Sequence, residues 1–138
     1  MLYRKKPLLV SVLFISVVTT SLFVYYNLIQ LGSGYEDITV EQAKELIETN
    51  LSLVILDVRT EAEYNDEYIE GAINIPLDEL QQRLVEINPN DKILVYCRTG
   101  NMSTQAAEIL VENGVSGFYR MRGGIVAWKQ KGYPVTKK

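Results

Sequence analysis

Short apolar segments that alternate with helical patterns constrain the fold of this chain more than any other feature. The segments that resemble strands are Val54–Val58, Ala72–Ile75, Ile93–Tyr96 and Phe118–Met121, with a further extended piece starting at Ile38. Nearly continuous apolar strands are typical of sheets that are buried on both faces. Their alternation with helices favours a mostly parallel sheet. We therefore expect an α/β fold of three layers, with about five strands and helices on both faces of the sheet.

Capping residues mark where the intervening helices begin. Thr39 with Gln42, and Thr60 with Glu63, have the spacing of a capping box, in which two side chains satisfy backbone groups at a helix start. The first box precedes a helix with apolar residues at helical spacing, and the second opens a short helix. Further helices are expected over Asp78–Val85, Ser103–Glu112 and Ile125–Lys131.

The first 34 residues differ in composition from the rest of the chain. Three basic residues at positions 4–6 precede an almost unbroken apolar run, Leu8–Ile29, and no acidic residue occurs before Glu36. About 20 apolar residues are enough to cross a bilayer core of roughly 30 Å as a helix. We therefore expect one transmembrane or signal helix ahead of the folded domain, contacting the membrane through residues 8–29.

This leader divides the chain into a signal anchor or transmembrane segment (1–30), a linker (31–35) and a folded domain (36–138). The basic residues should stay in the cytoplasm, which predicts a single-pass protein of the cell membrane whose C-terminal domain is extracytoplasmic. The alternative is secretion after cleavage of a signal peptide. An apolar region longer than the usual 7 to 15 residues favours the uncleaved anchor.

The charge pattern narrows the class of partner. All 17 acidic residues lie after residue 35, where 11 of the 14 basic residues also lie, so the folded domain has six more acids than bases. A nucleic-acid interface would need clustered lysine and arginine on one face. We therefore expect no nucleic-acid partner. Small molecules or proteins are the expected partners, and the sequence does not identify which protein.

The single cysteine occupies a chemically primed position. Cys97 directly follows the apolar stretch Ile93–Tyr96 and opens the sequence Cys-Arg-Thr-Gly-Asn-Met-Ser, which precedes a helical pattern. Loop amides and the N-terminus of a helix together stabilise negative charge on such a sulfur. A thiolate is the nucleophilic form of cysteine, so Cys97 is the candidate catalytic residue.

The absence of histidine excludes several kinds of chemistry. The chain has one cysteine and no histidine, so neither Cys-His nor Ser-His-Asp catalysis is possible. One cysteine without histidine also cannot assemble the usual zinc ligand set, and we expect no metal site and no cofactor. A single cysteine forms no internal disulfide.

The domain resembles the rhodanese-like family, which is typified by thiosulfate sulfurtransferase. The resemblance is carried by five blocks in order, which are Leu56–Arg59, Glu63-Tyr64, Gly71–Pro76, Cys97–Ser103 and Gly123–Trp128 followed by Gly132–Val135. It implies the three-layer fold of that family. It also implies transfer of sulfur from thiosulfate or a similar donor to cyanide or a thiol, through a persulfide on Cys97.

The resemblance also assigns roles to the loop. Arg98, Thr99, Gly100, Asn101, Met102 and Ser103 form the active-site loop, and the amides of Arg98 to Met102 cradle the persulfide. Asp57 and Arg59 are expected to support the site by fixing the end of a strand and the adjacent loop through hydrogen bonds or an ion pair, with a direct role in substrate binding as the alternative. Gly123 and Gly124 are expected to supply backbone freedom at a turn beside the loop, and Trp128 and Tyr133 to pack in the core.

Two departures from the family pattern bear on activity. Met102 stands where many members have arginine, which removes one anion-binding contact. The family segment Gly-His-Ile-x-Gly-Ala corresponds to Glu67–Ala72, with tyrosine in place of histidine. Related cysteine phosphatases need an arginine six residues after the cysteine, and this position is Ser103. Because the arginine and the histidine of the family pattern are both missing, the alternative to an enzyme is a low-turnover module that binds a partner or senses sulfur or redox state.

The remaining acidic cluster has a simpler interpretation. Its members are Glu61, Glu63, Asp66, Glu67 and Glu70. We expect them to form a solvated helix face, because a paired-carboxylate mechanism would need two of them held in a cleft.

Overall fold

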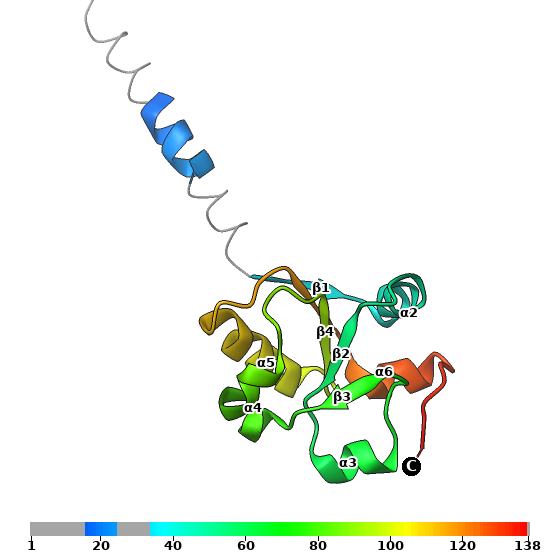
Figure 1. Ribbon diagram of the computed structural model, residues 1–138. Coiled ribbons are helices and arrows are strands. Elements are labelled where there is room, and N and C mark those ends of the chain that lie inside the picture. Colours follow the sequence, from blue (N-terminus) through cyan, green and yellow to red (C-terminus); the bar gives the residue numbers. More distant parts are fainter. Residues whose placement is uncertain (1–15, 25–33, 138) are drawn as a thin grey trace, which may run out of the picture. The chain divides into compact units, whose positions relative to one another are not determined.

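The computed structural model describes residues 16–24 and 34–137 (Figure 1). Gly34–Lys138 form a compact unit by themselves. Its elements in chain order are β1 (Tyr35–Ile38), α2 (Val40–Thr49), β2 (Val54–Asp57), α3 (Glu61–Asp66), β3 (Ala72–Asn74), α4 (Leu77–Arg83), the 3₁₀ helix η1 (Leu84–Glu86), β4 (Ile93–Tyr96), α5 (Asn101–Glu112), β5 (Phe118–Met121) and α6 (Gly124–Gln130).

In the described part of the chain, five strands form one sheet in the order β1-β5-β4-β2-β3, and every neighbouring pair is parallel. The expected α/β fold with about five strands is confirmed. Since the strands are parallel, their carboxyl ends meet at one edge of the sheet, where α/β proteins bind ligands. Strand β4 is central, and Cys97 follows it at this edge.

Helices cover both faces of the sheet, as Figure 1 shows, with α4 and α5 on one face and α2 and α6 on the other. Side chains of β4 alternate between the two. Ile93 and Val95 pack with the helices α4 and α5, and Leu94 and Tyr96 pack with α2 and α6. All four are fully buried, which explains why this strand reads as a continuous apolar run.

Local sequence signals account for the helix starts and for part of the core. Both capping boxes are present, with Thr39 paired to Gln42 and Thr60 paired to Glu63. Trp128 is buried, and its indole N–H donates to the Pro134 carbonyl at 2.8 Å. Tyr133 packs edge-on against it with ring centroids 5.0 Å apart. Both aromatic residues are therefore packing residues, as expected.

The first strand begins earlier in the chain than the sequence pattern predicts. It covers Tyr35–Ile38, so Ile38 ends the strand instead of starting it, and the expected linker over 31–35 overlaps the strand at Tyr35. Strand β1 lies at an edge of the sheet, and Glu36 and Asp37 in its middle are exposed. The apolar pattern misses this strand because its two middle residues are exposed acids. Only Tyr35 and Ile38, at its ends, pack against the core.

Helix α5 begins at Asn101, two residues earlier than expected. Gly100 forms its N-cap without a side-chain hydrogen bond, so the start carries no capping signal in the sequence. As a result, Asn101, Met102 and Ser103 lie in the first turn of the helix instead of in a loop.

Within the leader, the structure describes a helix over residues 16–24 with exposed side chains. No helix in the described residues is both long enough and apolar enough to cross a membrane. The rest of the expected anchor, 1–15 and 25–30, and residues 31–33 of the linker lie outside the described residues. The anchor therefore stays a prediction.

Candidate active site

Cys97 directly follows the central strand and is buried, with 1% of its surface exposed. It continues the alternation of β4 and packs on the same face as Val95, within the apolar cluster under α4 and α5. The sulfur thus lies at the carboxyl edge of the parallel sheet, next to the start of α5.

The turn from Cys97 to Gly100 points a hydrogen-bond donor at the sulfur. The backbone N–H of Gly100 donates to Cys97 Sγ at 3.1 Å. Gly100 has a φ of 114°, in the left-handed region that glycine adopts without steric strain. Because Gly100 is also the N-cap of α5, the sulfur lies beside the positive end of that helix. The N–H and the helix end both stabilise negative charge on the sulfur.

The other predicted loop residues divide into three environments. Three are exposed, namely Arg98, Thr99 and Asn101. Met102 is half-buried and packs against the apolar cluster that contains Cys97, which accounts for an apolar side chain at this position. Ser103 is buried, and its hydroxyl donates to the Gly100 carbonyl at 2.9 Å. Ser103 therefore holds the turn closed.

The start of α6 lies against the backbone of the site. The N–H groups of Ile125 and Val126 donate to the carbonyls of Cys97 and Arg98 at 2.9 and 3.1 Å. A Cβ atom on Gly124 would lie 2.4 Å from both of those carbonyl oxygens. Gly124 is therefore required for close approach as well as for the turn expected from the sequence. Two carbonyl dipoles are thereby bound by α6.

Arg120 is a site residue that the sequence patterns did not reveal. From β5, its guanidinium donates to the Gly100 carbonyl at 3.3 Å and to the Thr104 hydroxyl at 2.9 Å. It also forms an ion pair with Asp37 of β1, with Nε 2.7 Å from Oδ1. The available signal was the alternation of β5, which places Arg120 on the same face as the buried Phe118.

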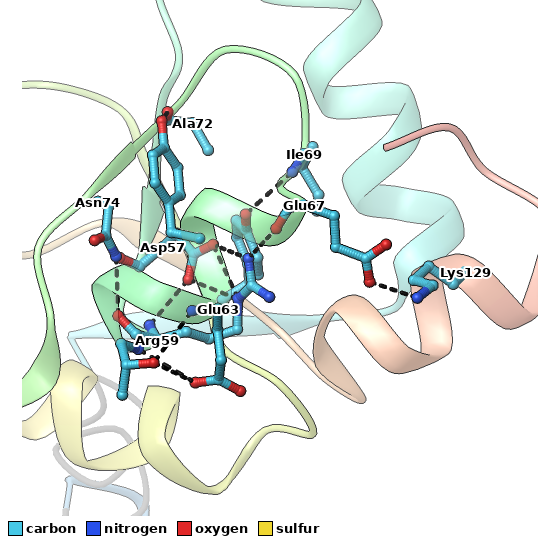
Figure 2. Close-up of polar contacts among 11 residues, drawn as sticks. Asp57, Arg59, Glu63, Glu67, Ile69, Ala72, Asn74 and Lys129 are labelled. Atoms are coloured by element: carbon cyan, nitrogen blue, oxygen red, sulfur yellow. Dashed lines mark hydrogen bonds and ion pairs between the residues drawn. The ribbon is translucent and has the colours of Figure 1, made fainter. Parts of the chain in front are cut away.

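Asp57 and Arg59, the expected supporting residues, form a buried ion pair at the end of β2 (Figure 2). Arg59 Nη2 lies 2.6 Å from Asp57 Oδ2, and Nε lies 3.0 Å from both carboxylate oxygens. Arg59 also donates to the Glu67 carbonyl at 2.6 Å. Burial alone would lower the pKa of Arg59, but its hydrogen bonds to Asp57 raise it. The pair thus ties the end of β2 to the segment after α3.

Tyr96 belongs to the same network. Its ring lies under the Arg59 guanidinium, with 5.8 Å between the guanidinium carbon and the ring centroid. Its hydroxyl accepts the Ile69 N–H at 3.2 Å. Burial, together with the charge of Asp57, raises the pKa of Tyr96 well above its ordinary value. Since Cys97 is the next residue, the network fixes the strand that delivers the sulfur.

A cleft of about 510 Å³ lies beside the loop. It is lined by Arg59, Glu63, Asp66, Glu67, Arg98, Ile125, Val126, Lys129 and Gln130. Glu67 pairs with Lys129 across the cleft, and Glu63 caps α3 (Figure 2). Both carboxylates are half-buried, so the acidic cluster is only partly the solvated face expected from the sequence. Arg98 lines this cleft, and its carbonyl accepts the Val126 N–H, so it belongs both to the cleft and to the backbone of the site.

Comparison with known proteins agrees with this geometry. Residues 39–131 match the rhodanese-like domain family. The chain is 34% identical over 100 residues to YrkF of Bacillus subtilis, covering 72% of this chain but only 54% of that protein. It is 34% identical over 95 residues to the thiosulfate sulfurtransferase GlpE of Coxiella burnetii, covering 69% of this chain and 88% of GlpE.

A solved structure shows the same fold. The crystal structure of a rhodanese-related protein from Thermoplasma volcanium matches with a TM-score of 0.68 and 33% sequence identity, covering 75% of this chain and 100% of that one. The family match covers more than half of the chain and includes Cys97, the Gly100 turn and the start of α6. The chain therefore belongs to the rhodanese-like domain family.

Proposed function

We propose that this protein is a sulfurtransferase in which Cys97 carries sulfur as a persulfide. The observation that carries the proposal is the Gly100 N–H, 3.1 Å from Cys97 Sγ at the start of α5. The name of the related C. burnetii protein, thiosulfate sulfurtransferase, supports thiosulfate as the donor.

The reaction has two displacement steps. The Cys97 thiolate attacks the outer sulfur of thiosulfate, an S–S bond forms to Cys97, and the original S–S bond breaks to release sulfite with its electron pair. Cyanide or a thiolate then attacks the outer sulfur of the persulfide and restores the Cys97 thiolate. A covalent intermediate of this kind divides one difficult transfer into two easier ones.

The surrounding backbone serves both steps. In the thiolate, negative charge resides on Cys97 Sγ, where the Gly100 N–H and the N-terminal end of α5 stabilise it. In the persulfide the charge moves to the outer sulfur, where the same helix end stabilises it. The carbonyls of Cys97 and Arg98 bond to α6, so these two dipoles are engaged away from the reacting sulfur. Arg98 is exposed beside the cleft and attracts the anionic donor.

Intact-protein mass spectrometry of the full chain tests the proposal. After incubation with thiosulfate, the protein should gain the mass of one sulfur atom, and cyanide should remove it with formation of thiocyanate. The Cys97→Ala variant, which lacks the only thiol, should show neither change. An unmodified protein whose thiol still reacts with an alkylating reagent would overturn thiosulfate transfer.

The burial of Cys97 favours a second candidate function. With 1% of the residue exposed, the persulfide could form and persist without rapid exchange, as in a module that senses sulfur or binds a protein partner. Steady-state turnover with thiosulfate and cyanide separates the two functions. An enzyme releases many thiocyanate ions per chain, whereas a low-turnover module releases about one.

We also propose that residues 8–29 anchor the chain in the cell membrane with the domain outside the cytoplasm. The support is the length of the apolar run and the basic residues before it. Carbonate extraction of membranes should leave the full chain in the pellet, and external protease should digest the domain in spheroplasts. Release of the domain in soluble form would instead indicate a cleaved signal peptide.

A further inference from the structure

We propose that Arg120 is a positioning residue of the Cys97 site, which holds the Gly100 turn from β5 and adds positive charge beside the sulfur. The proposal rests on the proposed function, because it concerns the anionic sulfur of that reaction. Arg98 is the only charged residue of the Cys97–Ser103 sequence, and it is exposed. Arg120, from another element, contacts the Gly100 carbonyl and is shielded from solvent.

The register of the sheet brings Arg120 to the site. Arg120 pairs with Val95 across the parallel strands β5 and β4. Residues that pair in register point to the same face, and Cys97 lies two residues beyond Val95 on that face. Arg120 and Cys97 are thus one strand and two residues apart, under the start of α5.

The Gly100 residue connects the two side chains. Its N–H donates to Cys97 Sγ, and its carbonyl accepts from Arg120 Nη1, the Ser103 hydroxyl and both the N–H and the hydroxyl of Thr104. Four donors on one carbonyl fix the orientation of the peptide unit that follows Gly100. Because the N–H of a peptide unit points opposite to its carbonyl, they also fix the Asn101 N–H at the free end of α5.

The guanidinium is itself held in place. It pairs with Asp37 and lies over the ring of Tyr35, which stacks on Phe118. Only 12% of the Arg120 side chain is exposed, so solvent screens its charge weakly. Burial would lower the pKa of Arg120, but its hydrogen bond and ion pair with Asp37 raise it above the ordinary value. The guanidinium therefore keeps its positive charge where it contacts the Gly100 turn.

Charge near Cys97 can be measured without any sulfur transfer. Iodoacetate and iodoacetamide alkylate a thiolate by the same displacement, but only iodoacetate is an anion. The second-order rate constant for iodoacetate divided by that for iodoacetamide, both measured at one pH, therefore reports the positive charge near the sulfur. We would measure this ratio on the full chain and on its Arg120→Gln, Arg120→Lys and Arg122→Gln variants. Arg122 is the matched control, an exposed arginine two residues along the chain.

The expected result is a ratio about fivefold lower in Arg120→Gln, equivalent to ~1 kcal/mol of charge interaction. Arg120→Lys should keep the ratio within about twofold, because it keeps the charge at the same strand position. Arg122→Gln should leave it unchanged. An unchanged ratio in Arg120→Gln would overturn the proposal. If both reagents then slowed equally, Arg120 would have a structural role only, and if neither rate changed it would have no role at the site.

Folding does not obscure the result. The Asp37 side chain is 39% exposed, so it tolerates loss of its partner, and the Asp37→Asn, Arg120→Gln double variant removes both charges if the single variant unfolds. Failure of the proposed function is separate, because it appears as absence of the persulfide in wild-type protein while the alkylation ratio stays measurable.

Discussion

Gly124 lies so close to Cys97 that a Cβ atom on it would sit 2.4 Å from the Cys97 carbonyl oxygen. Its φ of 58° is also in the left-handed region. A Gly124→Ala variant must therefore move α6 away from the site backbone. We expect it to lose ~3 kcal/mol or more of unfolding free energy, from overpacking together with left-handed strain. It should also form persulfide more slowly, which the mass measurement records.

Gly132 provides the matched control for this prediction. It has a φ of 73°, but the space around the position of a Cβ atom is open. Gly132→Ala should therefore show the left-handed strain alone, ~1 kcal/mol, and form persulfide at the wild-type rate. Equal losses in the two variants, measured by urea unfolding, would mean that the contact with Cys97 does not matter.

The buried ion pair of Asp57 and Arg59 gives a second prediction. Asp57 is fully buried and Arg59 is 3% exposed, so removal of the arginine leaves an unpaired charge in the core. Arg59→Leu should lower the unfolding free energy by ~3–5 kcal/mol. The double variant Asp57→Asn, Arg59→Leu, which removes both charges, should be more stable than Arg59→Leu alone. A double variant that is less stable would contradict this account of the pair.

Sequence patterns predicted the frame of the molecule because its strands and caps are local signals. The range Ile93–Tyr96 and both capping boxes were predicted without error, since a buried central strand is uniformly apolar and a capping box involves residues three apart. The edge strand β1 and the start of α5 were misplaced. Exposed acids interrupt β1, and glycine caps α5 without a side chain.

The chemistry of the site was only partly predictable, because local patterns reveal only those site residues that lie close together in the sequence. Cys97 and the Gly100 turn are adjacent in sequence, so the loop motif identified them. Arg120 reaches the site through the pairing of β5 with β4 and is held by Asp37, 83 residues away in sequence. Contacts of this range depend on the register of the sheet, which no local pattern specifies.

The raised pKa of Tyr96 predicts a loss of stability at alkaline pH. A folded-state pKa above the unfolded value of about 10 means that, above that pH, the unfolded chain releases a proton that the folded chain keeps. Stability from this group is therefore complete below pH 10 and declines as the pH rises further. The slope is ~1.4 kcal/mol per pH unit for one proton.

Tyr96→Phe should be less stable at neutral pH, because the Ile69 N–H loses its acceptor. Above pH 10, however, its unfolding free energy should fall less steeply than that of the wild-type protein. Urea unfolding from pH 8 to pH 11 measures both effects. If the unfolding free energies of the two proteins fell equally with pH over that range, Tyr96 would not be the group that causes the loss of stability at alkaline pH.

Arg98 gives the last prediction, which concerns capture of the donor. It is exposed beside the cleft, whereas Arg120 is shielded, so its charge acts on an approaching anion through solvent. Arg98→Gln should raise the KM for thiosulfate severalfold with little change in kcat, and the difference from wild type should shrink as salt is added. Lys92→Gln is the matched control, because Lys92 is an exposed cation before β4, at the opposite end of the strand from Cys97. Attraction to Arg98 requires that only the Arg98 variant changes KM; a fall in kcat alone would place Arg98 in the chemical step instead.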